Sequence, residues 1–358
     1  MTPTEGSGGS ARRLAGGAAT ADCAACLRAR PHLHGIKPMN DLRSKLADRS
    51  HWVRLYGTTP PREGSTDEVV QAAATKLYER IKDLPVDGTV VYDIQDESAR
   101  TAAPRPFPFM RTVDPRGYSA LLRSLTGKPA VTYKCIGQTN AAGWRAWLDQ
   151  AAAEYGVELL SVVGRASSRG AAADALSLPE ALAIAAAHPA GFALGGVTIA
   201  ERHGGGESES RRMLEKARHG CSFFVSQAVY HAEPTVRMLT DYSRECREAG
   251  VKPSRVVLTF TPCGREKTMT FIKWLGIAMP KATERAILTA KSPLAMSIEI
   301  CRANLREILA HEDYADVPLG VNVESVAINK DEIDASIDLF HSLEELVQQY
   351  RDAHGYHV

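Results

Sequence analysis

From Trp52 onward, short apolar runs alternate with longer segments in which apolar residues recur every three or four positions. Apolar runs without period-two alternation are typical of strands buried on both faces, and the longer segments have the period of amphipathic helices. The pattern predicts eight strands, at 52–56, 89–94, 130–134, 158–163, 192–199, 223–225, 255–261 and 320–324. The predicted helices between them include 66–82, 140–154, 207–219 and 234–249. Gly220 and Gly250 follow the last two helices, at the position after a helix that glycine favours.

Eight strand–helix units in roughly 300 residues favour a closed (β/α)8 TIM barrel of the α/β class over an open doubly wound sheet. A helical insertion at 283–310 precedes the eighth strand of this predicted barrel. We expect residues 39–358 to form this single domain. Residues 1–38 are rich in Gly, Ala, Ser and Arg without apolar periodicity, which predicts a disordered N-terminal extension.

The composition narrows the classes of partner. A net charge of +1 without a basic block argues against nucleic acid and against a membrane surface. The seven cysteines are odd in number and scattered, so they predict no disulfide framework but a reduced, cytoplasmic protein. No apolar run has the length needed to cross a bilayer, and the N-terminus lacks the apolar core of a secretion signal. The sequence leaves the oligomeric state open, a homo-oligomer included.

Polar residues gather at the predicted strand ends, where the active site of such a barrel lies. The candidates are Tyr56, Asp93, Gln95, Asp96, Glu97, Arg100, Lys134, Arg165, Glu201, Arg202, His203, Gln227, Tyr230, Thr259, Thr261, Asn322 and Glu324. Carboxylates beside cationic side chains can hold the shifted pKa values that acid–base chemistry requires, although a salt bridge or helix cap is the alternative for each. No HxH, HExxH or CxxC pattern lies there, so no metal site is predicted.

Gln227 closes the buried strand at 223–225. A buried amide must find hydrogen-bond partners, and both a ligand and a neighbouring loop can supply them. Cys263, just past the seventh strand, is either a nucleophile or a buried structural thiol.

Five segments in order carry a family resemblance. They are Leu55-Tyr-Gly-Thr-Thr-Pro-Pro-Arg62, Ala200-Glu-Arg-His203, Phe223-Phe-Val-Ser-Gln227, Trp274-Leu-Gly-Ile-Ala-Met-Pro280 and Ala327-Ile-Asn-Lys-Asp-Glu332. Through them the chain from about 52 to 346 resembles the methylenetetrahydrofolate reductase family of folate-dependent flavoprotein barrels. The resemblance implies reduction of 5,10-methylenetetrahydrofolate with NAD(P)H, flavin-assisted or flavin-free. The alternatives are transfer of the folate one-carbon unit to a small-molecule acceptor without net reduction, or a catalytically silent folate-binding protein.

The resemblance also assigns roles. Gln227 matches the glutamine that binds the pterin, and Glu201 and His203 fall in the loop that lines FAD. We place Arg165 beside this cofactor region, where its fixed charge and the missing aspartate leave FAD binding open. We take four further strand-end residues as substrate-binding candidates: Tyr56, Lys134, Tyr230 and Glu324.

Two departures from the family pattern bear on the chemistry. The family's first-strand glutamate, the proposed acid, aligns with Gly57, and its Arg-Gly-Asp after strand four becomes Gly164-Arg165-Ala166. Opening of the methylene bridge requires a proton that glycine cannot supply. We expect the acid among three residues that continue the second strand, next to the first: Asp93, Asp96 and Glu97. The alternative is that these carboxylates cap the following loop or pair with Arg100 and Arg105. The proton would then come from Glu201, Glu324 or a bound water.

Overall fold

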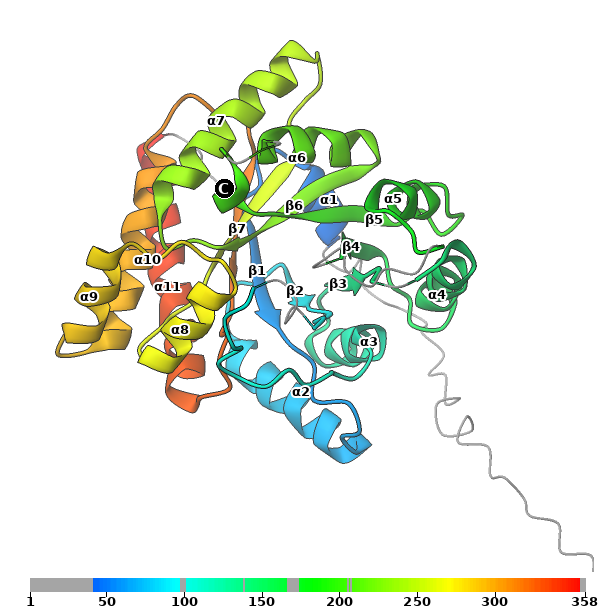
Figure 1. The fold of residues 1–358 in the computed structure, drawn as a ribbon, viewed down its shortest axis with the longest axis horizontal. Helices are drawn as coiled ribbons and strands as arrows, with labels where there is room; N and C mark the ends of the chain where they lie inside the picture. The colour runs from blue at the N-terminus through cyan, green and yellow to red at the C-terminus, as the bar shows by residue number, and fades with distance from the viewer. Residues whose placement is uncertain are drawn as a thin grey trace, which may run out of the picture. The chain divides into compact units, whose positions relative to one another are not determined.

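Eight parallel strands close into a barrel in chain order, with β8 paired to β1 (Figure 1). The computed structural model describes residues 41–96, 101–137, 139–165, 174–204, 206 and 208–354. The strands are β1 Val53–Thr58, β2 Gly88–Val91, β3 Ala130–Cys135, β4 Leu159–Val163, β5 Ala193–Thr198, β6 Cys221–Ala228, β7 Arg255–Phe260 and β8 Leu319–Val323. The predicted (β/α)8 barrel is confirmed. The predicted boundary between 1–38 and 39–358 lies outside the described residues.

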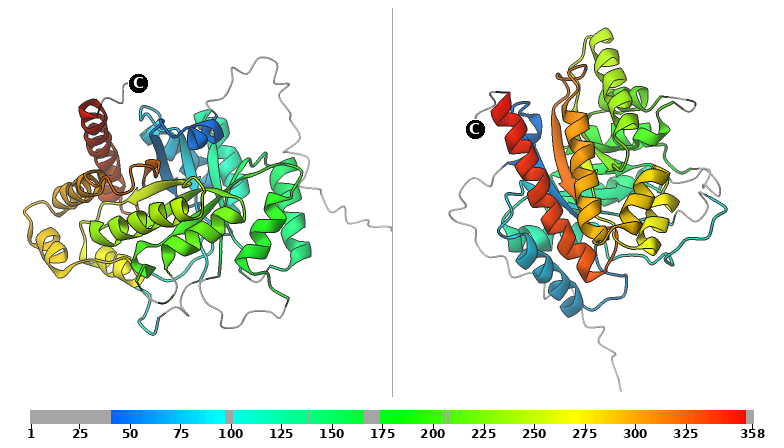
Figure 2. Two further views of the ribbon diagram at one scale, coloured as in Figure 1. Left: turned by 90° about the horizontal axis from the view of Figure 1, so that it is seen from above. Right: turned by 90° about the vertical axis from the view of Figure 1, so that its left-hand side faces the viewer.

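Helices surround the barrel (Figure 1). They are α1 Leu42–Ala47, α2 Asp67–Ile81, α3 Pro115–Thr126, α4 Ala141–Ala153, α5 Leu178–Ala186, α6 Glu209–Arg218, α7 Ala232–Glu248, α8 Glu266–Trp274, α9 Lys281–Thr289, α10 Pro293–Leu309 and α11 Lys330–Ala353. The predicted insertion before the eighth strand is present as α9 and α10. Figure 2 shows α11 alongside α10, so the insertion packs on the last helix. Across the described part of the chain, no helix combines the length and apolarity needed to span a membrane.

Two apolar cores result from the alternation of side chains along the strands. The outer core lies between strands and helices, and the inner core fills the barrel, with members such as Leu55, Val131 and Phe223. Gly195 is required here because a Cβ would lie 2.4 Å from the Phe223 ring. Helix α1, which the sequence did not predict, adds Leu42 and Leu46 to the inner core. Six residues are too few to show a helical period.

Arg255, at the start of β7, anchors the segment that contains α1. Its buried guanidinium donates to the backbone carbonyls of Leu46, Asp48 and Leu319. We expect Arg255→Met to lower the free energy of unfolding by about 2 kcal/mol or more, because buried carbonyls lose their donors. Urea denaturation measures this loss. Arg237→Met is the control, since the Arg237 side chain is 58% exposed, and equal stabilities of the two variants would contradict the anchoring role.

Candidate functional site

The carboxyl of Glu324 lies beside Gly57 at the C-terminal end of the barrel. Parallel pairing places Leu55 of β1 opposite Asn322 of β8, so Gly57 and Glu324 follow on the same inward face. A Cβ on Gly57 would lie 2.9 Å from Glu324 Oε2 and 3.0 Å from Tyr92 Oη. A carboxyl from the end of β8 and a tyrosine from the end of β2 therefore fill the space that a side chain on β1 would take.

Asn322 connects these groups. Its Nδ2 donates to Tyr92 Oη at 2.9 Å and to Thr259 Oγ1 at 3.2 Å, and it lies 3.5 Å from Glu324 Oε2. Tyr92 Oη and Glu324 Oε2 both lie within 3.0 Å of the place that a Cβ on Gly57 would take, and a hydrogen bond from Tyr92 lowers the pKa of the Glu324 carboxyl. Within the described residues, Asn322 Oδ1 is buried without a hydrogen-bond partner, so one acceptor remains for a water or a ligand.

Burial raises the pKa of Glu324 to about 6, and the hydrogen bonds from Tyr92 and Asn322 oppose this rise. Burial also raises the pKa of Tyr92 well above its usual range. A carboxyl that titrates this close to neutrality can hold a proton and release it, which suits a general acid.

Asp93 and Asp96, two of the three candidate acids after β2, do not share the buried environment of Glu324. Asp93 Oδ2 accepts the backbone N–H of Cys135 at 2.8 Å and lies 3.3 Å from Lys134 Nζ. These contacts join the ends of β2 and β3, and they pair Asp93 with Lys134 rather than with Arg105. Asp96 is exposed, and Glu97 and Arg100 lie outside the described residues.

Gln227 lies where the pairing of β6 with β7 shifts register, between Val225 and Ala228. Such an irregularity re-aims the side chain. Its Nε2 donates to Leu275 O at 2.8 Å, while its Oε1 is buried without a partner among the described residues. Both sequence interpretations of Gln227 thus have support, because a loop satisfies the donor and the acceptor is left for a ligand.

Tyr56 and Tyr230, the two tyrosines predicted to bind the substrate, are buried, and their hydroxyls form hydrogen bonds with other residues of the protein. Tyr56 alternates with the inward-facing Leu55 and Gly57, so it points outward, and its hydroxyl lies 2.6 Å from Ser336 Oγ on α11. Tyr230 is also buried and donates to Thr261 O. The Tyr56 hydroxyl therefore ties β1 to α11, and the Tyr230 hydroxyl joins the segments that follow β6 and β7.

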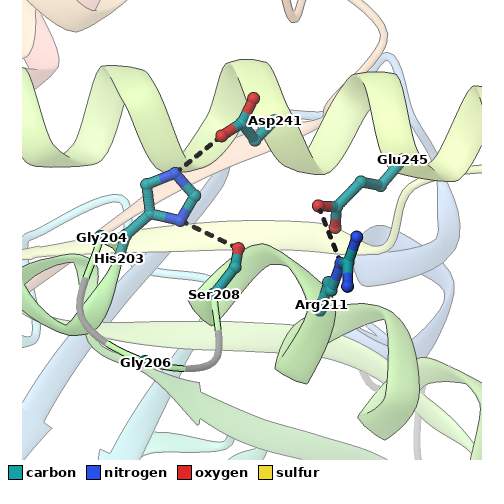
Figure 3. A pocket seen from close by; sticks show the side chains of 7 residues that line it. All are labelled: His203, Gly204, Gly206, Ser208, Arg211, Asp241 and Glu245. Carbon is teal, nitrogen blue, oxygen red and sulfur yellow. Dashed lines mark hydrogen bonds and ion pairs between the residues drawn. The ribbon is translucent and has the colours of Figure 1, made fainter.

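His203 lines a cavity of about 360 Å³ on the outer side of the barrel, between α6 and α7 (Figure 3). Its Nε2 lies 2.9 Å from Asp241 Oδ2, and Ser208 Oγ lies 3.3 Å from Nδ1. Arg211 and Glu245 form an ion pair at 3.7 Å along the same cavity. His203 is turned toward α7, and both of its ring nitrogens have partners.

The other two residues assigned to FAD, Glu201 and Arg165, differ in whether the protein satisfies their polar atoms. Glu201 Oε1 accepts the N–H of Ala278 at 3.0 Å, in the loop that also receives Gln227. Arg165 Nη1 is buried without a hydrogen-bond partner among the described residues, so it can receive an anionic group. Because Glu201 and His203 are engaged by the protein, these residues do not form a cradle for a flavin ring.

Cys263, the candidate nucleophile, is buried. Burial raises the pKa of its thiol to about 12, which does not suit a nucleophile.

The part of the loop between β2 and α3 that contains Ala103 and Arg105 packs against α8. The Arg105 guanidinium lies 4.9 Å from the centroid of the Phe271 ring and 5.3 Å from that of Trp274. Trp274 Nε1 donates to Ala103 O at 3.0 Å. Cation–π and hydrogen-bond contacts thus hold this part of the loop on α8.

Comparison with solved structures finds a relative that shares almost a third of its sequence with this chain. An uncharacterized protein from Clostridium thermocellum, which binds two copies of 5-methyl-5,6,7,8-tetrahydrofolic acid, is 31% identical to this chain, with a TM-score of 0.71. The match covers 86% of this chain and 99% of that protein. The chain belongs to the family of that protein. Since the match covers nearly all of the relative, the family shares the whole barrel.

More distant structures share less with this family. A 2,3-dimethylmalate lyase is 11% identical, with a TM-score of 0.41 and coverage of 75% of this chain and 95% of its own. A phosphonopyruvate hydrolase is 13% identical, with a TM-score of 0.41 and coverage of 87% of both chains. Neither likeness bears on the site. No family model and no curated protein matches the chain.

Proposed function

We propose that this protein is a tetrahydrofolate-dependent enzyme of one-carbon metabolism, which reduces 5,10-methylenetetrahydrofolate with NAD(P)H at the mouth of its barrel. The observation that carries the proposal is the Glu324 carboxyl, which lies beside Gly57 at the mouth and whose pKa is raised by burial to about 6. The family relative supports the substrate class, because 5-methyltetrahydrofolate, which it binds, is the product of this reduction.

The reaction needs one proton and one hydride. When the methylene bridge opens, the bond between N10 and the bridging carbon breaks, N10 takes up a proton, and the carbon becomes an iminium on N5. A hydride from the nicotinamide then adds to this carbon and gives 5-methyltetrahydrofolate and NAD(P)+. Glu324 supplies the proton to N10 and takes another from solvent. We derive no step through a flavin, because Glu201 and His203 do not fit one.

The position of Glu324 accounts for the glycine at position 57. In the reductase family that the chain resembles, the proposed acid stands on the first strand, at the position of Gly57. Here a carboxyl enters the same space from β8, since Glu324 Oε2 lies 2.9 Å from where a Cβ on Gly57 would be. A closed barrel permits this change because β1 pairs with β8 as well as with β2.

Gln227 is the proposed contact to the pterin, through its Oε1, which accepts no hydrogen bond from the residues that the structure describes. We expect Gln227→Ala to weaken the binding of 5-methyltetrahydrofolate about tenfold, the effect of one lost hydrogen bond of roughly 1.4 kcal/mol. Calorimetric titration measures the affinity, and a thermal melt shows whether losing the bond to Leu275 O unfolds the protein. Tyr56→Phe is the control, because that hydroxyl contacts Ser336 instead. Wild-type affinity of Gln227→Ala would remove Gln227 from the site.

The function itself is tested by mixing purified protein with 5,10-methylenetetrahydrofolate and NADH or NADPH, without added FAD. We expect oxidation of the nicotinamide and equimolar formation of 5-methyltetrahydrofolate. Transfer of the carbon to a small-molecule acceptor without nicotinamide oxidation would replace reduction by one-carbon transfer. Binding of the folate without conversion would indicate a silent folate-binding protein.

A further inference from the structure

We propose that Tyr92 is a positioning residue for Glu324: held by Asn322, it donates its hydroxyl hydrogen to the carboxyl and fixes the acid beside Gly57. The inference rests on the proposed function for the role of Glu324 as the acid. Tyr92 itself transfers no proton to the substrate.

The directions of the hydrogen bonds follow from the chemistry of the groups. An ionised carboxylate only accepts, so the side of Asn322 that faces Glu324 Oε2 is its NH2 group. The same Nδ2 donates to Tyr92 Oη at 2.9 Å, so this oxygen acts as an acceptor there. The hydroxyl hydrogen of Tyr92 is then left for its other partner, the Glu324 carboxyl.

The ring of Tyr92 is held on two further sides. It meets Tyr133 edge to face, with 4.9 Å between the ring centroids. On the β1 side it lies over Gly57, where a Cβ would come within 3.0 Å of both Tyr92 Cε2 and Tyr92 Oη. Glycine at position 57 thus makes room for the tyrosine that reaches Glu324.

The titratable groups that interact with Glu324 among the described residues are tyrosines. They are Tyr56 in β1, Tyr92 directly after β2 and Tyr133 in β3, and burial raises the pKa of each. All three stay neutral at physiological pH, and Asn322 carries no charge. Burial and hydrogen bonds therefore govern the titration of Glu324, and removal of the Tyr92 hydroxyl must raise the pKa of this carboxyl.

The test is Tyr92→Phe, with Tyr133→Phe as the matched control that removes a neighbouring hydroxyl. Infrared difference spectra against Glu324→Gln report the protonation of Glu324 across pH in ligand-free full-length protein. We expect a wild-type midpoint of about 6 and a Tyr92→Phe midpoint about one pH unit higher, with Tyr133→Phe near wild type. Asn322→Ala, which frees Tyr92 and removes its own bond to the carboxyl, is expected to raise the midpoint as well.

A midpoint of Tyr92→Phe equal to that of the wild type overturns the proposal. If Tyr92→Phe does not fold, Tyr92→Met, which removes the hydroxyl and leaves Asn322 in place, decides by the same midpoint. The spectra need no turnover, so they decide the role of Tyr92 even if the protein reduces no folate. If the protein does reduce the folate, the basic limb of the pH profile of kcat is expected to move with the infrared midpoint. A purely structural Tyr92 would lower kcat at every pH without moving that limb.

Discussion

Replacing Glu324 by glutamine is expected to lower kcat for reduction of 5,10-methylenetetrahydrofolate at least about 100-fold, the range for loss of a general acid. Glutamine keeps the size of the side chain but holds no transferable proton. Affinity for 5-methyltetrahydrofolate is expected to stay within about threefold of wild type, since no bond at N10 breaks on binding this product. Steady-state kinetics and calorimetric titration measure the two effects separately.

The pH dependence of the wild type follows from the same carboxyl. A general acid must be protonated, and the pKa of Glu324 is raised to about 6, so kcat is expected to fall as pH rises through 6. This limb should be absent from the residual rate of Glu324→Gln. Asp93→Asn separates the two candidate acids. If Asp93→Asn loses turnover while Glu324→Gln keeps it, the proton comes from the β2 end, as the sequence predicted.

The same substitution, Glu324→Gln, is expected to stabilise the fold although it lowers kcat. Below the usual carboxyl pKa of 4.5, Glu324 is protonated in both the folded and the unfolded chain, and its titration has no effect. Between 4.5 and 6 the unfolded chain loses the proton first, so rising pH favours unfolding. Glutamine removes this cost. Glu324→Gln is therefore expected to be about 1–2 kcal/mol more stable than wild type at pH 8, with the advantage gone near pH 4.

The barrel could be predicted from the sequence because its signal is distributed over many residues. Strands buried on both faces and amphipathic helices repeat along the whole chain, so one weak element does not change the count. The inserted helices α9 and α10 were visible for the same reason. Helix α1 was not visible, because its two apolar residues, Leu42 and Leu46, give no period.

The site was harder to predict, because it depends on which strands meet. Both Glu324 and Asn322 are among the polar residues predicted at the strand ends. The acid that replaces a side chain at Gly57, however, was predicted on the second strand, which follows the first along the chain. In a closed barrel the first strand also pairs with the last, and this contact brings Glu324 to Gly57. The sequence does not single out Tyr92, because a tyrosine at the end of an apolar run is typical of core packing.

The direction of the side chains explains why Tyr56 and His203 lie elsewhere than the sequence predicts. Tyr56 was expected at the mouth, yet strand alternation turns it outward when its neighbour Gly57 faces inward. The loop after β5 has no such period, so the sequence could not show that His203 turns toward α7.

Moving the acid from the end of β8 to β1 is expected to show that a carboxyl from either strand can occupy the same position at the mouth. Gly57→Glu alone should lower kcat at least about 100-fold and destabilise the fold by about 1–3 kcal/mol, because its Cβ would overlap Glu324 and Tyr92. Glu324→Gly alone should lose as much activity, because it removes the acid.

The double variant Gly57→Glu with Glu324→Gly is expected to recover at least about tenfold in kcat over Glu324→Gly, since one carboxyl again occupies the space beside Tyr92. It should also melt at a higher temperature than Gly57→Glu, because the overlapping carboxyl is gone. Gly57→Gln with Glu324→Gly is the control, with the same bulk and no acid. If the two double variants have equal kcat, filling the space accounts for any recovery, and the carboxyl of Glu324 is not the proton donor. Recovery by the glutamate alone requires that the reaction use a carboxyl at this place, whichever strand carries it.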